Sequence, residues 1–203
     1  MYPQLSQTIE KLRQQTISPE RKAILQPLIN FIQQKVSARK NADINFICTH
    51  NSRRSHLAQV WAQTAAHYFN IPEVYCYSGG TEATALFPKI VETLVEAGFR
   101  ISVIASTDNP VYGIKYSENT LPVIGFSKRY DDSFNPTSAF AAVMTCSQAD
   151  SGCPFIAGAG QRIAITFEDP KVADDTMEQA QVYAQRSLQI AAEMFYVFSM
   201  IEK

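Results

Sequence analysis

Residues 44–58 read Ile44-Asn45-Phe46-Ile47-Cys48-Thr49-His50-Asn51-Ser52-Arg53-Arg54-Ser55-His56-Leu57-Ala58. A short apolar run ends at Cys48, polar residues follow, and a helical spacing of apolar residues begins at Arg54. This order predicts a buried strand, a loop and the N-terminus of a helix. Helix N-termini, unpaired backbone N–H groups and a nearby guanidinium all stabilise a thiolate and attract a tetrahedral oxyanion. The segment is therefore a candidate nucleophile loop of the form Cys-x5-Arg.

The side chains of this loop suggest a division of roles. Cysteine is a nucleophile and a good leaving group, and arginine can donate two parallel hydrogen bonds to an oxyanion. We expect Cys48 to attack, Arg54 to bind the anion and Ser55 to donate to the thiolate. The rest of the expected oxyanion-binding loop comprises Thr49, His50, Asn51, Ser52 and Arg53. Because a Cys and an Arg at this spacing are common by chance, the flanking strand and helix patterns carry the prediction.

The composition excludes several classes of protein. The chain has 203 residues, of which 46% are apolar and 18% charged, so it can bury one ordinary core. A net charge of −1 and a pI near 6.3 give no overall basic field, which argues against nucleic acid and anionic membrane surfaces as partners. No run of about 18 apolar residues occurs, and the N-terminus does not read as a leader. We therefore expect a cytoplasmic protein without membrane contact.

The cysteines bear on redox chemistry and on metal binding. In a cytoplasmic chain of this size, reactive thiols are expected in preference to structural disulfides. The sequence holds no Cys-x2-Cys pair, and its three histidines lie far from the pair formed by Cys146 and Cys153. We predict no metal site and no cofactor, and we assign Cys76, inside an expected strand, to the core.

Strand-like and helix-like segments alternate from Asp43 onward, which favours an α/β fold with a parallel four-stranded sheet and helices on both faces. The expected strands cover 44–47, 73–78, 139–145 and 163–167, and the expected helices cover 54–68, 88–97 and 176–200. Between 103 and 138 the periodicity is lost, and apolar stretches at 111–116 and 122–127 predict a β-hairpin. This insertion either walls the active site or is a plain surface excursion.

We expect residues 1–41 to form an N-terminal helical extension to a catalytic domain at 42–203. Apolar residues at helical spacing predict two helices broken near Ser18-Pro19, with Pro27 as a kink or a delayed start of the second. The extension is either a helical hairpin packed on the main domain or a dimerisation or regulatory arm. A homodimer through these helices is thus one of the alternatives.

Reactive side chains also follow two other expected strands. Asp169 follows the expected strand 163–167, on the same edge as Cys48, and is a candidate general acid, although Asp-Pro is also an ordinary turn signal. Cys146 ends the strand 139–145, and Cys153 lies seven residues later. A thiol near an activated cysteine can resolve an adduct on it, and a second thiol can carry the disulfide outward. The alternative is a pair of unpaired structural thiols.

These segments together resemble the thioredoxin-coupled arsenate reductases, which share the fold of low-molecular-weight protein tyrosine phosphatases. The likeness rests on 46–55, Ser78-Gly79-Gly80, Thr145-Cys146, Cys153-Pro154 and 167–170. It covers Ile44 to the C-terminus apart from the insertion, and leaves 1–41 unexplained. The resemblance implies that Cys48 is the nucleophile, Arg54 the oxyanion ligand, Ser55 the thiolate partner and Asp169 the general acid. It makes Cys146 and Cys153 the first and second resolving thiols and thioredoxin the electron donor.

The sequence departs from the family pattern at four positions. His50 stands for a loop glycine, which predicts a shifted loop or a left-handed residue, and Arg53 stands for a second cysteine. Arg53 is either a compensating charge or a solvated residue at the helix start. Gln59 replaces a glutamate that in many of these reductases helps to bind potassium, so we expect no metal ion. Lys171 stands where the phosphatases have aromatic residues, which favours a small inorganic anion as substrate.

The favoured hypothesis is arsenate reduction by a thiol relay. The closest alternative is a low-molecular-weight protein tyrosine phosphatase that hydrolyses phosphotyrosine or small phosphoesters with Cys48, Arg54 and Asp169. A third hypothesis, from another class, is a non-catalytic redox or oxyanion sensor whose N-terminal helices signal to a partner.

Overall fold

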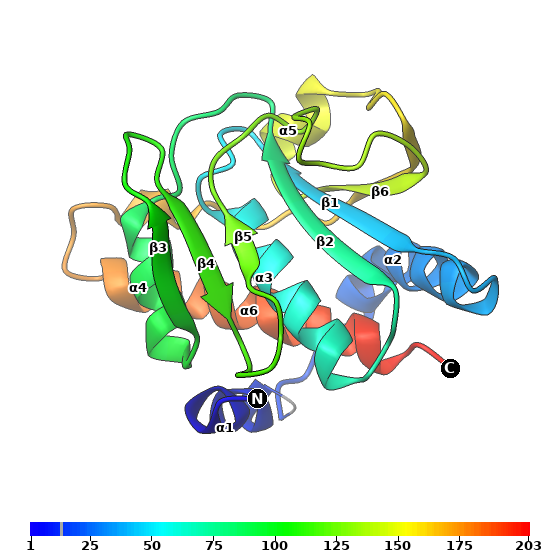
Figure 1. The fold of residues 1–203 in the computed structure, drawn as a ribbon, viewed down its shortest axis with the longest axis horizontal. Coiled ribbons are helices and arrows are strands. Elements are labelled where there is room, and N and C mark those ends of the chain that lie inside the picture. Colours follow the sequence, from blue (N-terminus) through cyan, green and yellow to red (C-terminus); the bar gives the residue numbers. More distant parts are fainter. Residues whose placement is uncertain (13) are drawn as a thin grey trace.

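The computed structural model describes residues 1–12 and 14–203, and within these ranges a four-stranded parallel sheet forms the middle of the fold (Figure 1). The strand order is β2-β1-β6-β7, with β1 at Ala42–Cys48, β2 at Val74–Gly80, β6 at Phe140–Met144 and β7 at Ala159–Ala164. The central strands β1 and β6 are buried almost throughout, as apolar runs in a parallel sheet require. The predicted α/β fold with a parallel sheet is confirmed.

The register of the sheet determines which residues meet at its carboxyl edge. Ile47 of β1 is paired with Met144 of β6, and Cys48 is paired with Gly80 of β2. Cys48 and Cys146 therefore leave neighbouring strands at the same edge. Helices α2 (Pro19–Ser37), α3 (Arg54–Tyr68) and α6 (Gln179–Ser199) share one core cluster with one face of the sheet, and the short α5 (Ser147–Gly152) packs with the other face.

The predicted N-terminal helices are present as α1 (Pro3–Leu12) and α2. The Ser18 hydroxyl accepts a hydrogen bond from Arg21 N at 3.2 Å, and Pro19 occupies the first turn, so α2 has a regular N-terminal cap. Pro27 lies inside α2 and does not delay its start, contrary to one expectation. Both helices bury most of their apolar residues in the same core as the sheet, although Ile24 of α2 is exposed. No helix in the described part of the chain is long and apolar enough to span a membrane.

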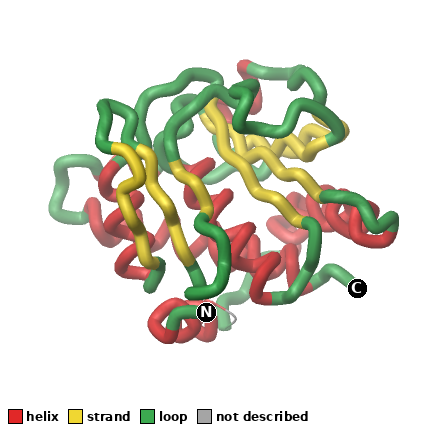
Figure 2. Tube along the Cα trace, viewed as in Figure 1, coloured by secondary structure: helices red, strands yellow, loops and turns green. Residues whose placement is uncertain are grey.

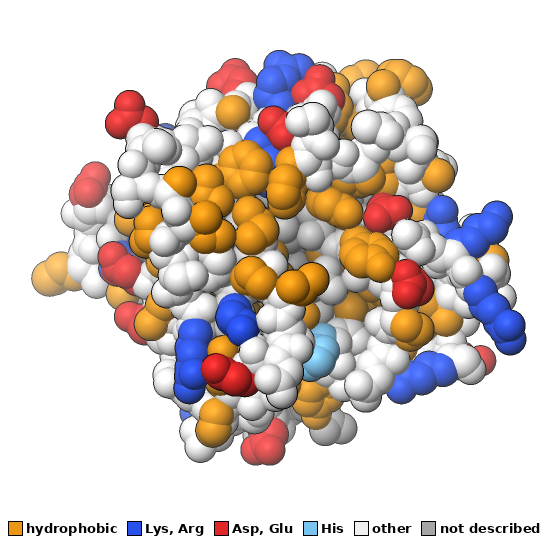
Figure 3. All heavy atoms as spheres, in the orientation of Figure 1, with side chains coloured by type: hydrophobic (Ala, Val, Ile, Leu, Met, Phe, Trp, Pro, Cys, Tyr) orange, Lys and Arg blue, Asp and Glu red, His pale blue; other side chains and the backbone are white. Residues whose placement is uncertain are grey.

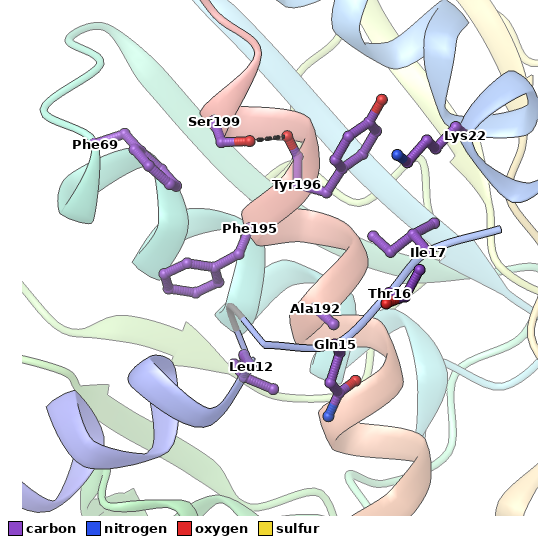
Figure 4. A pocket seen from close by; sticks show the side chains of 10 residues that line it. All are labelled: Leu12, Gln15, Thr16, Ile17, Lys22, Phe69, Ala192, Phe195, Tyr196 and Ser199. Atoms are coloured by element: carbon purple, nitrogen blue, oxygen red, sulfur yellow. Dashed lines mark hydrogen bonds between the residues drawn. The ribbon is translucent and has the colours of Figure 1, made fainter. Parts of the chain in front are cut away.

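A pocket of about 300 Å³ lies between residues 14–17 and α6 (Figure 4). Its lining mixes apolar side chains such as Leu12 and Phe195 with Lys22, whose ammonium lies 5.3 Å from the centroid of the Tyr196 ring. Figure 1 shows α1 at the opposite end of the molecule from the carboxyl ends of β1 and β2. This pocket is therefore separate from the candidate site.

The insertion contains a second, antiparallel sheet in the order β3-β4-β5, beside β2 (Figure 2). Strands β4 (Val111–Lys115) and β5 (Val123–Gly125) form the expected hairpin, but β3 (Arg100–Ala105) lies where the pattern predicted none. A bulge between Val103 and Ala105 breaks the alternation, and Val103 and Ile104 are exposed, so the pattern of a half-buried strand is lost. Apolar side chains gather on this face of the molecule (Figure 3).

Other boundaries also differ from the predictions, and β7 starts at Ala159 and not at 163. The pairing of β7 with β6 ends at Ala164 and not at Phe167, but Ile165 and Phe167 still donate backbone hydrogen bonds to Met144 O and Thr145 O at 3.0 and 3.1 Å. The chain thus keeps its direction toward the carboxyl edge. The last helix starts at Gln179 and not at Thr176, because a 3-10 turn, η1 (Pro170–Ala173), and further turns come first. Helix α4 (Pro88–Ala97) ends as expected at Gly98, whose φ of 107° is left-handed.

Candidate active site

The loop between β1 and α3 has its left-handed residue at Asn51, where φ is 44°. The prediction that His50 might need this conformation is therefore wrong, and asparagine tolerates it better than most residues do. The His50 imidazole is half exposed, and its Nε2 lies 3.7 Å from Glu82. A side chain at position 50 thus points outward and does not require the flexibility of glycine.

The Cys48 thiol is buried at the base of this loop, with Sγ 3.1 Å from Ser55 Oγ. Asn51 Nδ2 donates a hydrogen bond to Ser55 Oγ at 2.9 Å. Because the Ser55 oxygen already accepts from Asn51, its own proton is free to point at the sulfur. The three residues thus form a short buried chain of hydrogen bonds that ends at the Cys48 sulfur.

Arg54 and Asp169 are in direct contact. Arg54 Nη2 lies 2.5 Å from Asp169 Oδ2, and Nη1 donates to Phe167 O at 3.0 Å. Arg54 Nε is buried without a hydrogen-bond partner in the described residues, so it is a donor available to an oxyanion. A pocket of about 430 Å³ opens beside Arg54 and Asp169. These two groups therefore face a space large enough for a small anion.

Arg53 is directed away from the loop anion position. Its Nη2 lies 2.6 Å from Asp174 Oδ2, its Nε donates to Tyr183 Oη at 2.7 Å, and its guanidinium lies 4.0 Å from the centroid of the Phe87 ring. Burial opposes ionisation of Asp174, but hydrogen bonds from Tyr183 and Gln179 and the Arg53 charge keep its pKa below the usual value. The expectation of a solvated arginine is wrong, because Arg53 ties the loop to the start of α6.

The cysteines differ in their surroundings, and all four are free. Cys146 is buried at the end of β6, where its Sγ accepts from Ala149 N at 3.3 Å and lies 3.5 Å from Thr49 Oγ1. Cys48 and Cys146 belong to one small apolar cluster, and the partly exposed Cys153 packs against it. Cys76 is buried on β2, where desolvation and then the charge of Asp43 raise its pKa, so it is an unreactive core thiol.

Residues of the insertion form hydrogen bonds with the loop between β1 and α3. The sequence pattern did not predict these contacts. Lys128 N donates to Asn51 Oδ1 at 2.9 Å, and Ser127 Oγ donates to His50 O at 2.9 Å. Gly80 N donates to Lys128 O at 2.8 Å, and a Cβ on Gly80 would lie 2.7 Å from Asn51 N, so only glycine fits between them. Residues 77 positions apart meet here, so no local motif could reveal them.

The Lys128 ammonium itself is buried behind the loop. It donates to Phe126 O at 3.3 Å and lies 4.3 Å from the centroid of the Phe126 ring, and no carboxylate pairs with it among residues 1–12 and 14–203. Burial lowers its pKa to about 8. Gln59 Nε2, at the position discussed for potassium, donates to Cys76 O at 3.1 Å. The described residues contain no group of three His, Cys, Asp or Glu side chains that could hold a metal.

His56 lies on the first turn of α3. Its burial predicts that the free energy of unfolding depends on pH. It is fully buried, Nδ1 lies 3.2 Å from Ser78 Oγ, and burial together with the Lys128 charge lowers its pKa to about 3. In the unfolded chain His56 is protonated near pH 6.5. The stability that comes from burying the neutral imidazole is therefore complete above pH 6.5. It is lost as pH falls from 6.5 to about 3, by a total of about 5 kcal/mol.

Urea unfolding at several pH values checks this window. We expect His56→Gln to be less stable than wild type at pH 7 and to approach it at pH 4, because glutamine does not titrate. His50→Gln, which removes an exposed imidazole, is the matched control. A constant difference between His56→Gln and wild type from pH 7 to pH 4 would contradict the prediction.

Comparison with known proteins places the chain in a family. No protein-family profile matches the chain. The arsenate reductase of Bacillus subtilis (strain 168) is 31% identical over 147 residues, which cover 72% of this chain and 87% of that protein. The arsenate reductase of Staphylococcus aureus (strain Newman) is 32% identical over 130 residues, covering 63% and 77% of the two chains.

Two solved structures share the fold. A low-molecular-weight phosphotyrosine phosphatase from Vibrio cholerae superposes with a TM-score of 0.52 at 12% identity, over 78% of this chain and 95% of the other. A mutant of YwlE from Bacillus subtilis gives a TM-score of 0.51 at 15% identity, over 78% and 97%. At these identities the two structures show a common fold alone. With the match to curated relatives along most of their length, the chain belongs to the arsenate reductase family, built on the low-molecular-weight tyrosine phosphatase fold.

Proposed function

We propose that this protein reduces arsenate through a relay of thiols that begins at Cys48. Loop N–H groups and Arg54 hold the oxyanion, and the Cys48 thiolate attacks arsenic. Asp169 gives a proton to the departing oxygen, which leaves as water. The product of this step is a covalent adduct between the sulfur and arsenic(V).

The second step reduces the metalloid. The Cys146 thiolate attacks Cys48 Sγ, and the electron pair of the sulfur–arsenic bond stays with arsenic, which leaves as arsenite. A Cys48–Cys146 disulfide remains. Cys153 then attacks Cys146 and releases Cys48 as a thiolate, and a dithiol reductant such as thioredoxin reduces the resulting Cys146–Cys153 disulfide. A reducing cytoplasm keeps cysteine thiols in the reduced form, and the cycle must return to that form after each turnover.

One observation carries the proposal: Cys48 and Cys146 lie in one apolar cluster at the ends of paired strands, with Cys153 packed against it. A phosphatase needs only the first thiol, so a buried second thiol beside it favours a relay. The relatives named arsenate reductase support the same substrate. The third step requires movement, because Cys146 and Cys153 are separated by the whole of α5, about 10 Å of helix, whereas a disulfide needs Cα atoms within about 7 Å.

The test is arsenate-dependent oxidation of NADPH by the wild-type protein in the presence of thioredoxin and thioredoxin reductase. We expect steady turnover, with arsenite released in proportion to NADPH consumed. Cys76→Ser is the matched control, because it removes a buried thiol outside the relay and should leave turnover unchanged. Absence of arsenate-dependent oxidation by the wild type would refute the proposal.

A phosphatase is the second candidate, favoured by the same contacts of Cys48, Arg54 and Asp169. It predicts hydrolysis of p-nitrophenyl phosphate without any requirement for Cys146 or Cys153. A sensor predicts formation of a defined disulfide without turnover of either substrate. The two assays in parallel therefore separate the three functions.

A further inference from the structure

Arg162, on β7, holds both the middle and the end of α5 through one guanidinium. Its Nη2 donates to the carboxylate of Asp150 at 2.6 Å and also to the backbone oxygen of Asp150, and its Nε donates to Cys153 O at 3.0 Å. We call these contacts the Arg162 bridge. They fasten the segment that separates Cys146 from Cys153 to the edge strand of the sheet.

Without such contacts α5 would be weakly held. It has six residues, far fewer than an isolated helix needs to be stable in water, and only Ala149 among its residues is buried. Gly152 lies in open space, since a Cβ there would meet no atom within 4 Å, so no close packing at this position explains the glycine. Glycine weakens a helix by its backbone freedom, which leaves the bridge as the main charged restraint on this end of α5.

The bridge occurs in a structure in which Cys146 and Cys153 are both free thiols. Cys146 caps the start of α5 and Cys153 its end, so a disulfide between them forces α5 to unwind. We expect unwinding to move Cys153 O and the Asp150 backbone oxygen relative to each other, so that one planar guanidinium no longer bonds to both. The free energy of the bridge is therefore lost when the Cys146–Cys153 disulfide forms.

We propose that Arg162 is a positioning residue that sets how readily Cys146 and Cys153 pair. This inference deepens the proposed reductase function and rests on it for its biological purpose. Arg162 keeps α5 folded, and Cys153 apart from Cys146, while both thiols are free. The residue contacts neither the oxyanion loop nor the reacting sulfur atoms, and acts through α5 alone.

The experiment uses the full chain with Cys48→Ser and Cys76→Ser, in which Cys146 and Cys153 are the remaining thiols. The protein is equilibrated with mixtures of reduced and oxidised dithiothreitol, free thiols are trapped by alkylation, and the disulfide is counted by mass spectrometry. The two thiols pass two electrons and two protons to oxidised dithiothreitol, which becomes the dithiol. In this background we expect Arg162→Gln to shift the equilibrium toward the disulfide by about fivefold and to speed its formation.

Three variants in the same background exclude a general loss of structure. Arg100→Gln makes the same substitution at an ion pair that is more exposed than the Arg162 bridge, Arg100 with Glu118 at 3.0 Å on strand β3, and should not change the thiol equilibrium. Arg162→Lys keeps the charge but cannot bond to both oxygens at once, so it should lie between wild type and Arg162→Gln. Asp150→Asn weakens the same bridge from the other side and remains informative if Arg162→Gln does not fold.

An unchanged or lowered tendency to form the disulfide in both Arg162→Gln and Asp150→Asn would overturn the proposal. The assay contains no arsenate and needs no Cys48 thiol. A wild-type protein that fails to reduce arsenate but shows the expected shift in Arg162→Gln would refute the reductase function and leave the bridge standing. A wild-type protein that reduces arsenate, together with no shift in Arg162→Gln and Asp150→Asn, would refute the proposed role of Arg162 alone.

Discussion

Replacing Cys146 with serine is expected to abolish arsenate reduction while leaving the hydrolysis of p-nitrophenyl phosphate intact. Serine cannot form a disulfide, so the adduct on Cys48 has no thiol within the cluster to release arsenite. The proposed hydrolysis of a phosphoester uses Cys48, Arg54, Asp169 and water, and does not involve the second thiol. Arsenite release and p-nitrophenol release, measured on the same preparation, check this prediction.

Cys153→Ser should fail one step later than Cys146→Ser. Cys146 can still attack Cys48 in this variant, so each molecule should release a single arsenite and stop with a Cys48–Cys146 disulfide. A burst of arsenite equal to the enzyme concentration, with that disulfide found by peptide mapping, is the expected result. Continuous turnover by Cys153→Ser would exclude Cys153 from the relay, and a burst from Cys146→Ser would exclude the proposed order of attack.

The strand, loop and helix start around Cys48 could be predicted because their signals are local. An apolar strand, a polar loop and a helical repeat follow one another within 44–58, and each is decided by near neighbours. The hydroxyl of Ser55 lies beside the Cys48 sulfur, as the spacing suggested. The side-chain direction of Arg53 could not be foreseen, because Asp174 and Tyr183, which hold it, come more than 100 positions later.

Strand β3 and the contacts of Lys128 and Arg162 depend on tertiary contacts, which the spacing of apolar residues in the sequence does not reveal. Strand β3 is bulged and exposed, so its sequence does not alternate, and it exists because β4 pairs with it. Lys128 stabilises the loop through its backbone N–H, which is the same for any residue except proline. The Arg162 bridge depends on carbonyl oxygens of α5 and is equally invisible in the sequence. Prediction of the fold therefore succeeded where the pattern is local, and failed where distant backbone groups supply the contact.

Replacing Arg54 with lysine is expected to lower kcat/KM for both arsenate and p-nitrophenyl phosphate by about 10² to 10³. The Arg54 guanidinium contacts Phe167 O and Asp169 at once and still has Nε free for the anion. A lysine ammonium is a compact point charge without the planar fork of donors, and cannot replace the contacts with Phe167 O, Asp169 and the anion together. Because the same donor serves both substrates, the two activities should fall in parallel, and inhibition by phosphate should weaken with them.

Arg53→Lys is the matched control, since it makes the same change at the neighbouring position of the loop. The Arg53 guanidinium is engaged by Asp174, Tyr183 and the Phe87 ring, so its replacement should lower the free energy of unfolding more than the catalytic rate. Steady-state kinetics and urea unfolding on both variants separate the two effects. If Arg53→Lys lost activity as severely as Arg54→Lys did, the anion would have to be bound by both arginines, and the pairing of Arg53 with Asp174 would have to break when substrate binds.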